Sequence, residues 1–279
     1  MNHAPSTSRR AVLAGAGGLL TTALLSACAT GAPSVRVSSS PSVRRSAPTT
    51  QTPTPTPTPK TPTPMPTPVS IARQPLPGGT ITGLPTGTPG IAWTVDDGVD
   101  SSVVEAYARF ALETGTRLTF FVNGANPSWT EHADLLRPLV ASGQVQLGNH
   151  TWDHPALTRL SDQGIADELQ RNHDFIASTY GVDARPFYRP PFGYHDARVD
   201  AAAARVGYST PVLWYGSLAD SGDITTDQIV GFGEQWFLPA HIVIGHANHQ
   251  GTIAALPRLD QLLRDRRLAT FTLRDVFAT

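Results

Sequence analysis

The sequence predicts one alternating β/α domain that follows an N-terminal segment of very different composition. From residue 91 onward, short apolar runs alternate with longer amphipathic stretches, which is the pattern of repeated βα units. About 190 residues suffice for one well-buried core but are short for a full eight-stranded barrel. We therefore expect a barrel or open sheet with fewer than eight strands, with function at the carboxyl ends of the strands.

The individual elements follow from this periodicity in chain order. The apolar runs predict strands at residues 91–95, 118–123, 145–149, 186–189, 210–214, 241–244 and 270–272. The amphipathic stretches between them predict helices at residues 102–114, 131–142, 161–180, 197–207, 226–237 and 256–267. The result is a series of βα units that ends on a strand.

Charge divides the chain into the same two parts. Of 279 residues, 21 are Lys or Arg and 22 are Asp or Glu, which gives a formal net charge of −1. The first 90 residues hold seven of the basic residues and none of the acids, so residues 91–279 carry 14 arginines, no lysine and a net charge of −8. Because binding to phosphates needs clustered Lys and Arg, this balance argues against a nucleic-acid partner.

The first 27 residues have the composition of an export signal. Arg9 and Arg10 resemble a twin-arginine signal, and they precede an uncharged run at residues 11–27 that is too short and too weakly apolar for a membrane span. Residues 25–28, Leu-Ser-Ala-Cys, resemble the lipobox of bacterial lipoproteins, in which the signal is cut before the cysteine. We expect Cys28, the only cysteine of the chain, to carry lipid. An ordinary signal peptide with an incidental cysteine is the alternative.

Residues 28–78 are predicted to be a disordered tether rich in Ser, Thr and Pro. Residues 52–59 repeat Thr-Pro, and the segment offers few apolar side chains to offset the entropy of ordering. Alternating proline favours polyproline II at about 3.1 Å per residue, so the tether would span up to roughly 150 Å. We expect an extracytoplasmic, lipid-anchored protein whose domain, residues 79–279, reaches into the cell wall. A tail without a specific task has the same composition.

Polar clusters follow four of the predicted strands. They are Thr94-Val95-Asp96-Asp97-Gly98, His150-Thr151-Trp152-Asp153-His154, Arg189-Pro190-Pro191-Phe192-Gly193 and Gly245-His246. A single cluster is weak support for a site, because acidic residues cap helices and Asp-Gly forms turns. Four clusters at the carboxyl ends of parallel strands meet at one edge of the sheet and indicate a functional site.

These side chains have the chemistry of metal-assisted hydrolysis. Two His four residues apart, with a carboxylate from another strand, make a three-ligand site that leaves positions open for water, as in catalytic sites for zinc and related ions. Of two adjacent carboxylates, one can bind the cation while the other accepts the proton of the attacking water. A nearby Arg keeps that base ionised, and a further His can protonate an amine leaving group. The set predicts hydrolysis of an amide or an ester.

The motifs resemble those of the NodB-homology polysaccharide deacetylases, carbohydrate esterase family four. The His-Thr-x-x-His and Arg-Pro-Pro-Phe-Gly segments are the most specific, and the resemblance runs from about residue 90 in the family's order. It implies a distorted (β/α) barrel with fewer than eight strands and a divalent metal, which we expect to be zinc, with cobalt or another divalent ion as the alternative. It also implies Asp96 as the general base, Arg189 as the residue that orients this base, and His246 as the general acid.

The resemblance implies further roles. It makes the metal ligands Asp97, His150 and His154. The backbone N–H of Phe192 would help to hold the oxyanion, and Ile244 would face the acetyl methyl. Trp214 is expected to line the substrate pocket.

The fourth motif departs from the family's Asp-x-x-Asp-Trp. Its places here hold Ser217, Asp220 and Ser221, so the first Asp and a Trp of the groove wall are lost. The resemblance implies that Asp220 pairs with His246 and raises its pKa. A literal Asp-x-x-Asp at Asp220 and Asp223 leaves the register of this motif open. The departure bears on substrate choice more than on the chemistry.

We therefore expect a metal-dependent N-deacetylase that releases acetate from an N-acetylated glycan of the cell envelope. The tether favours peptidoglycan as this glycan. An O-acetyl esterase for a polysaccharide such as xylan and an inactive glycan-binding module are the alternatives. The expected partners are the glycan and, through lipid on Cys28, the membrane, and the protein is expected to be a monomer without a nucleic-acid partner.

Overall fold

A computed structural model describes residues 70–279 of the chain. The predicted export signal, the lipidation site Cys28 and the tether up to residue 69 lie outside the described residues. Within residues 70–279, no helix combines the length and the apolar composition that crossing a membrane requires.

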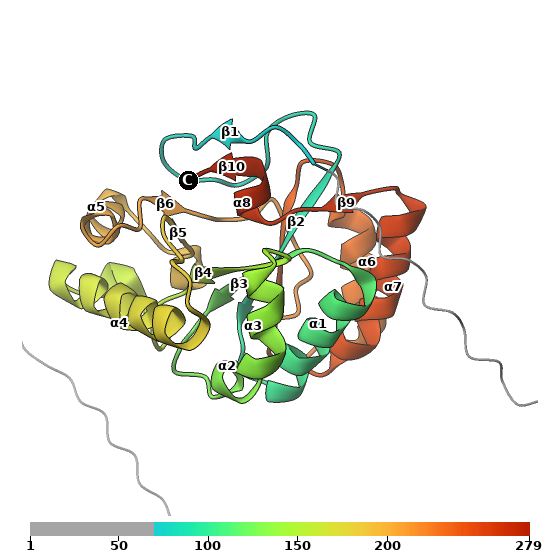
Figure 1. Ribbon diagram of the computed structural model, residues 1–279, viewed down its shortest axis with the longest axis horizontal. Helices are drawn as coiled ribbons and strands as arrows, with labels where there is room; N and C mark the ends of the chain where they lie inside the picture. Colours follow the sequence, from blue (N-terminus) through green and yellow to red (C-terminus); the bar gives the residue numbers. More distant parts are fainter. Residues whose placement is uncertain (1–69) are drawn as a thin grey trace, which may run out of the picture. The chain divides into compact units, whose positions relative to one another are not determined.

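A curled parallel sheet forms the centre of the domain, with helices around its outside (Figure 1). Its strands lie in the order β6-β5-β4-β3-β2-β8-β7, and each hydrogen-bonded pair is parallel. Their bounds are β2 Gly90–Asp97, β3 Leu118–Val122, β4 Val145–Asn149, β5 Phe187–Tyr188, β6 Thr210–Pro211, β7 Gly216–Ser217 and β8 Ile242–His246. Seven strands on this path confirm the expected distorted barrel with fewer than eight strands.

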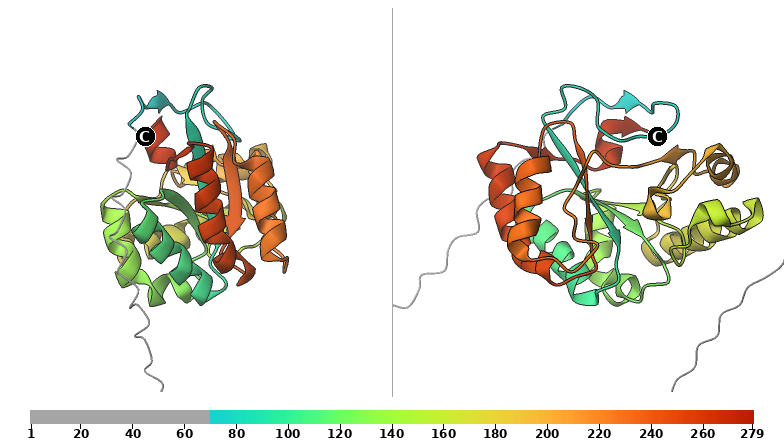
Figure 2. Two further views of the ribbon diagram at one scale, coloured as in Figure 1. Left: turned by 90° about the vertical axis from the view of Figure 1, so that its right-hand side faces the viewer. Right: turned by 180° about the vertical axis from the view of Figure 1, so that it is seen from behind.

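The helices alternate with these strands along the chain. They are α1 Ser101–Thr114, α2 Ser128–Glu131, α3 Ala133–Ala141, α4 Asp162–Tyr180, α5 Ala197–Arg205, α6 Thr226–Trp236, α7 Gly251–Asp265 and α8 Leu273–Val276. Local chemistry sets their ends. Asp100 caps α1 by accepting hydrogen bonds from the backbone N–H groups of Ser102 and Val103, and Gly115 ends this helix at a left-handed φ of 75°. Figure 2 shows α6 and α7 side by side next to β8.

The structure differs from the predicted elements of the repeated βα units most clearly in three places. The predicted helix 131–142 is two helices, α2 and α3, which meet at His132. The helix predicted to start at residue 256 starts at Gly251 and contains Pro257 in its interior. The strand predicted at 210–214 is only Thr210–Pro211, and the chain then forms the short strand β7, which the sequence did not predict.

An extended segment at residues 81–84 fills the gap between the sheet's two ends. Ile81 pairs with Val212, just after β6, and Gly83 pairs with His241, just before β8. The backbone N–H of Ile81 donates to Pro211 O at 2.9 Å, and that of Leu84 donates to Ala240 O at 2.8 Å. Backbone that lies outside the repeated βα units therefore bridges the chain after β6 and the chain before β8.

Residues 70–78, predicted as the end of the tether, pack on the domain. Strand β1, Gln74–Pro75, pairs in parallel with β10, Phe277–Ala278, at the C-terminus. Ile71 and Leu76 contact the buried cluster that includes Phe277. Two half-buried apolar side chains and one strand pair explain why this part of the Pro-rich segment takes a defined place.

Alternation along β2 separates two hydrophobic layers. Ile91, Trp93 and Val95 belong to the cluster between the sheet and the helices, whereas Ala92 belongs to the cluster inside the curl of the sheet. Successive side chains of a strand point to opposite faces, so Thr94 and Asp96 face the interior with Ala92. The same alternation therefore brings the carboxylate of Asp96 to the inner mouth of the half-barrel.

Gly90, at the start of β2, lies directly against the backbone of Ala269, which leaves no space for a side chain. A Cβ atom at residue 90 would lie 1.9 Å from Ala269 O, which is backbone and cannot swing away. We predict that Gly90→Ala lowers the free energy of unfolding by about 1–3 kcal/mol because of overpacking. The measurement is urea unfolding of the full chain. Gly78→Ala is the control, since a Cβ there meets no atom within 4 Å, and equal stability of the two variants would contradict the prediction.

Candidate metal centre and active site

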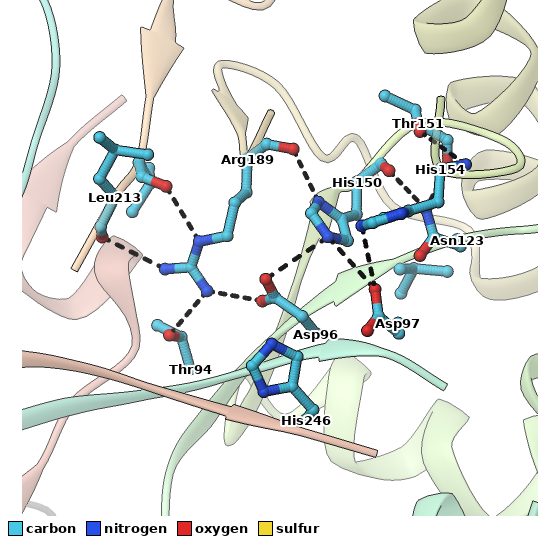
Figure 3. A network of polar contacts seen from close by, with 12 residues as sticks. Thr94, Asp96, Asp97, Asn123, His150, Thr151, His154, Arg189, Leu213 and His246 are labelled. Carbon is cyan, nitrogen blue, oxygen red and sulfur yellow. Dashed lines mark hydrogen bonds and ion pairs between the residues drawn. The ribbon is translucent and has the colours of Figure 1, made fainter. Parts of the chain in front are cut away.

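Three predicted ligand side chains converge at the carboxyl end of the sheet. Asp97 Oδ1 lies 3.3 Å from His150 Nε2 and 3.6 Å from His154 Nε2, and the three ligand atoms are within 4.8 Å of one another. Figure 3 shows both imidazoles directed at this carboxylate. Asp97 Oδ1 is buried and has no hydrogen-bond partner among the described residues. A buried, unsatisfied carboxylate oxygen between two imidazoles fits a divalent cation with nitrogen and oxygen ligands.

Left-handed backbone positions bring these ligands together. Asp97 ends β2 with a φ of 72°, and Thr151 and His154, after β4, have φ values of 71° and 65°. Side chains support this geometry, since Thr151 Oγ1 accepts a hydrogen bond from the His154 N–H at 3.1 Å. Asn123 Nδ2 donates to the carbonyls of His150 and Thr151 from the end of β3. The two His are four residues apart, and a tight turn rather than a helix brings them together.

Outer contacts orient the ligand atoms. His150 Nδ1 lies 2.7 Å from the carbonyl oxygen of Arg189, so it carries the hydrogen of the neutral ring and leaves Nε2 free to bind a cation. Asn248 Nδ2 donates to Asp97 Oδ2 at 2.7 Å, which leaves Oδ1 toward the two imidazoles. The carbonyl of Asp97 also accepts hydrogen bonds, from Asn126 Nδ2 and Trp129 Nε1.

Burial and charge both act on the three ligand side chains. Burial alone raises the pKa of Asp97, but the nearby imidazole of His150 and the hydrogen bond from the amide of Asn248 lower it below its usual range. Burial lowers the pKa of His150, while the carboxylates of Asp96 and Asp97 outweigh this and raise it. The pKa of His154 is lowered by burial and by the charge of His150.

Asp96, beside the candidate ligand Asp97, forms a buried ion pair with Arg189. Asp96 Oδ1 accepts a hydrogen bond from Arg189 Nη1 at 2.6 Å, and the two side chains are 2% and 0% exposed. Arg189 Nη1 also donates to Thr94 Oγ1, and Nε donates to Val212 O. Its guanidinium carbon lies 4.2 Å from the centre of the Phe121 ring. Burial lowers the pKa of Arg189, and the charge of Asp96 opposes this effect.

His246 lies on the other side of Asp96, because the two residues are register partners on β8 and β2. His246 Nδ1 is 3.1 Å from Asp220 Oδ1, and Thr252 Oγ1 donates to Asp220 Oδ2 at 3.2 Å. Burial lowers the pKa of His246, but the hydrogen bond to Asp220 and the charges of Asp96 and Asp220 raise it overall. Asp220 is fully buried and Asp223 is exposed, so Asp220 is the aspartate of the fourth motif that meets His246.

These groups open into one pocket of about 800 Å³. The predicted pocket residues Phe192, Ile244 and Trp214 line it, together with Ser217 and Ser221 of the altered fourth motif. Phe192 has a left-handed φ of 61° and a ring that is 56% exposed at the pocket mouth. The structure therefore brings together every predicted site residue within the described part of the chain.

Sequence reasoning missed the residues that support the site. Thr94, Asn123, Asn248 and Thr252 each hydrogen-bond a predicted site residue. Thr94 and Asn248 lie two residues from Asp96 and His246, and alternation along the strand was a usable signal for Thr94. Asn123 and Thr252 meet the site only through the fold, so the sequence carried no local signal for them.

The comparisons with known proteins agree with this geometry. Residues 83–211 match the family model described as polysaccharide deacetylase. An uncharacterized protein of Streptomyces coelicolor is 31% identical over 180 residues, which cover 64% of this chain and 68% of that protein. The chain belongs to the polysaccharide deacetylase family.

Two relatives with a described activity are longer proteins that match in part. Chitin deacetylase 1 of Cryptococcus neoformans is 39% identical over 119 residues, or 43% of this chain and 24% of that protein. The peptidoglycan-N-acetylglucosamine deacetylase PgdA of Listeria monocytogenes is 28% identical over 172 residues, or 60% of this chain and 34% of that protein. The chain thus matches about a quarter of the length of the first relative and about a third of the length of the second.

Solved structures share the fold of the family. A family 4 carbohydrate esterase from Streptomyces lividans, in complex with acetate, has a TM-score of 0.56 and 28% identity, and the match covers 66% of this chain and 93% of the esterase. A pseudoenzyme of the same family from Bacillus anthracis has a TM-score of 0.63 at 19% identity and covers 73% of this chain and 72% of that one. The fold is therefore shared by active and inactive members.

Asn248 is predicted to set the metal affinity through Asp97. Asn248→Ala removes the donor to Asp97 Oδ2, so the carboxylate is free to turn away, and we expect zinc affinity to fall about 10- to 100-fold. Competition with a chromogenic zinc chelator measures this affinity directly. Asn126→Ala is the matched control, because Trp129 still donates to the Asp97 carbonyl. An equal loss of zinc affinity in Asn248→Ala and Asn126→Ala would contradict the prediction.

Proposed function

We propose that the protein is a divalent-metal-dependent N-deacetylase that releases acetate from an N-acetylated glycan of the cell envelope, with peptidoglycan as the preferred substrate. One observation carries the proposal. A three-ligand set, a carboxylate clamped by arginine and a histidine paired with a carboxylate share one pocket. The similarity to PgdA supports the glycan class.

Asp97, His150 and His154 would hold the cation, and zinc suits this nitrogen and oxygen donor set, with cobalt or another divalent ion as the alternative. A divalent cation there would supply Lewis-acid polarisation of the acetamide carbonyl and acidify the attacking water. Two of the ligands are buried and the third is half-buried, so this chemistry would take place away from bulk solvent.

Asp96 would act as the general base. Its Oδ1 is held by Arg189, and its Oδ2 lies 3.5 Å from His150 Nε2, at the edge of the cation position. The ion pair with Arg189 fixes the orientation of this carboxylate, which would accept a proton from the attacking water. The backbone N–H of Phe192 would donate to the developing oxyanion.

His246 would act as the general acid. An amine is a poor leaving group until it is protonated, and the raised pKa of His246 favours the imidazolium that supplies this proton. Asp220 holds Nδ1 of the ring and leaves Nε2 for the substrate. Ile244, buried in the pocket wall two residues earlier on β8, would face the acetyl methyl group.

Localisation in the cell envelope is part of the proposal. We infer export by a twin-arginine-like signal, a lipid anchor at Cys28 and a Pro-rich tether, so that a monomeric domain reaches the wall. The similarity to peptidoglycan deacetylases supports an extracytoplasmic place of action. The acidic, lysine-free domain is consistent with a glycan rather than a nucleic-acid substrate.

An O-acetyl esterase on a polysaccharide such as xylan is the second candidate. Ser217 and Ser221 stand in the pocket where the family has an Asp and a Trp, which alters the substrate groove while the metal and acid/base set is kept. Mass spectrometry of acetylated xylan and of N-acetylated wall fragments after incubation separates the two activities. A third candidate, a glycan-binding module without activity, has a precedent in the pseudoenzyme of this fold. This candidate predicts that the protein binds the glycan but releases no acetate when zinc or cobalt is added.

Substitutions of Asp96 and of His150 are predicted to have different effects on zinc binding and acetate release. Asp96→Asn keeps the metal ligands but removes the base, so we expect zinc binding to persist while acetate release falls about 10²- to 10⁴-fold. His150→Ala removes a ligand, and both zinc binding and acetate release are expected to be lost. Metal analysis and an acetate assay on the full chain measure the two quantities. A fully active Asp96→Asn variant contradicts the assignment of the base.

Asp220 is predicted to set the alkaline limit of the pH profile. Because Asp220 raises the pKa of His246, Asp220→Asn lowers this pKa, and the protonated acid is lost at a lower pH. The alkaline limb of kcat therefore moves toward acidic pH, while the asparagine Oδ1 still accepts a hydrogen bond from His246 and Nδ2 can donate to the Thr252 hydroxyl. The exposed Asp223→Asn variant is the control and is expected to keep the wild-type profile. An unchanged alkaline limb of the kcat profile in Asp220→Asn would contradict the proposed effect of Asp220 on the pKa of His246.

A further inference from the structure

Exposed hydrophobic side chains gather at the mouth of the active-site pocket. Among residues 70–279, six large hydrophobic side chains are exposed, and three of them line this pocket, namely Val99, Phe192 and Tyr194. Tyr194 is 59% exposed. Exposed apolar side chains that are scattered singly need no explanation, but a group of them at the rim of a pocket indicates a binding surface.

The loop after β5 holds the two aromatic rings in place. The N–H of Gly193 donates to Pro190 O at 3.0 Å, and the N–H of Tyr194 donates to Pro191 O at 3.1 Å. Two prolines and two turn hydrogen bonds restrict this backbone before any ligand arrives. The backbone that carries the two rings is therefore restricted before a ligand packs on them, and the rings lie next to each other, with 5.7 Å between their centres.

The rings of Phe192 and Tyr194 follow one another from the candidate metal ligand His154 toward the outside of the pocket. The Phe192 ring packs edge-on against the candidate ligand His154, with 4.6 Å between ring centres. The Tyr194 ring is the next one out, 5.7 Å from Phe192 and tilted by 37° to it. A group bound on Tyr194 would thus lie beside the reaction centre and one ring further from the metal ligands.

Polar side chains line the rest of the mouth. Asn123, Asn126, Asp153 and Asn248 line the pocket from the loops after β3, β4 and β8, whereas the loop after β5 contributes the aromatic rings. A pyranose ring has the matching chemistry, with C–H groups on its faces and hydroxyl groups around its edge. The pocket volume of about 800 Å³ lies in the upper part of the range of about 300–1,000 Å³ that holds drug-sized ligands, which leaves space for a second sugar ring.

We infer that Tyr194, supported by Phe192, forms a stacking subsite for the sugar next to the one that carries the reacting acetyl group. The inference rests on the proposed function for the class of ligand, because the polymer must present a neighbouring ring. The site therefore binds a chain of N-acetylated sugars more tightly than a single sugar, and Tyr194 provides the difference. Tyr194 is a specificity residue here and takes no part in the proton transfers.

The test compares chain length across matched variants of the full chain. Tyr194→Ala removes the ring and Tyr194→Phe keeps it, while Tyr215→Ala removes an equally exposed tyrosine, 61% exposed, that does not line the pocket. The probes are the N-acetylglucosamine monomer and tetramer. Binding is measured by calorimetry in the Asp96→Asn background, and KM and kcat are measured in the active protein.

The expected result is a loss of chain-length preference in one variant only. Tyr194→Ala weakens tetramer binding about three- to tenfold and raises KM for the tetramer by a similar factor, with little change in kcat and in monomer binding. Tyr194→Phe and Tyr215→Ala keep the wild-type preference. Since Tyr194 is largely exposed, thermal unfolding is expected to be the same in all three variants.

Two results would overturn the subsite, and neither depends on the proposed activity. Equal affinity of wild type and Tyr194→Ala for the tetramer, or the same loss in Tyr215→Ala, removes Tyr194 from glycan recognition. If the wild type releases no acetate from any glycan, the proposed function fails, and the binding comparison in the Asp96→Asn background still decides the subsite.

Discussion

The buried ion pair between Arg189 and Asp96 is the interaction on which the arrangement of the site depends. Both side chains are removed from water, and the desolvation of such a pair is repaid only when every remaining donor and acceptor is satisfied. Arg189 meets this condition through Thr94 on β2 and the carbonyls of Val212 and Leu213 after β6. The guanidinium thereby joins strands that are far apart in the order of the sheet. Removal of one partner would leave an unpaired buried charge, at a cost of about 3–5 kcal/mol.

This pair also couples the candidate metal centre to the proposed base. The side chain of Arg189 holds Asp96, while its backbone carbonyl lies at hydrogen-bond distance from His150 Nδ1. One residue therefore fixes the orientation of a proposed general base and of a candidate metal ligand that directly follows β4. A small movement of the loop after β5 would displace both groups together, and the two prolines that directly follow Arg189 restrict this backbone.

The sequence allowed the strands and helices of the repeated units to be predicted because each long element has a clear period. The α4 helix and strands β2 to β4 are examples, and their observed bounds lie within a few residues of the expected ones. Elements without a period were missed. Strand β7 has two residues, and β1 becomes a strand only because β10 lies beside it. Helix α7 contains Pro257 in its interior, where proline costs about 3 kcal/mol, so the pattern placed the start of the helix beside the proline instead of at Gly251.

Site residues divide in the same way. Asp96, Asp97, His150 and His154 lie in short motifs, and strand alternation and strand-end position were enough to predict that they meet. The choice between Asp220 and Asp223 needed the fold, because the loop after β7 has no period and its path is set by the contact of Asp220 with His246 and Thr252. The sequence did not predict the role of Asn248 for another reason. Its amide acts on Asp97 from a different strand end, and an isolated asparagine after a strand is an ordinary turn residue.

The placement of these groups separates the chemistry from the choice of substrate. The proposed ligands, base and acid project from β2, β4 and β8 and are tied to buried partners such as Arg189 and Asp220. The surfaces that would meet the glycan lie elsewhere, on the loop after β5 with its exposed rings and on β7 and the loop that follows it, where Ser217 and Ser221 replace larger side chains. Among the described residues, the side chains of Tyr194, Ser217 and Ser221 form no hydrogen bond with Asp96 or Arg189, so these three residues can change without removing a contact of the buried ion pair. The altered fourth motif is therefore compatible with an intact reaction centre. Its effect on the choice of substrate is expected at the rim of the pocket, where the changed side chains lie.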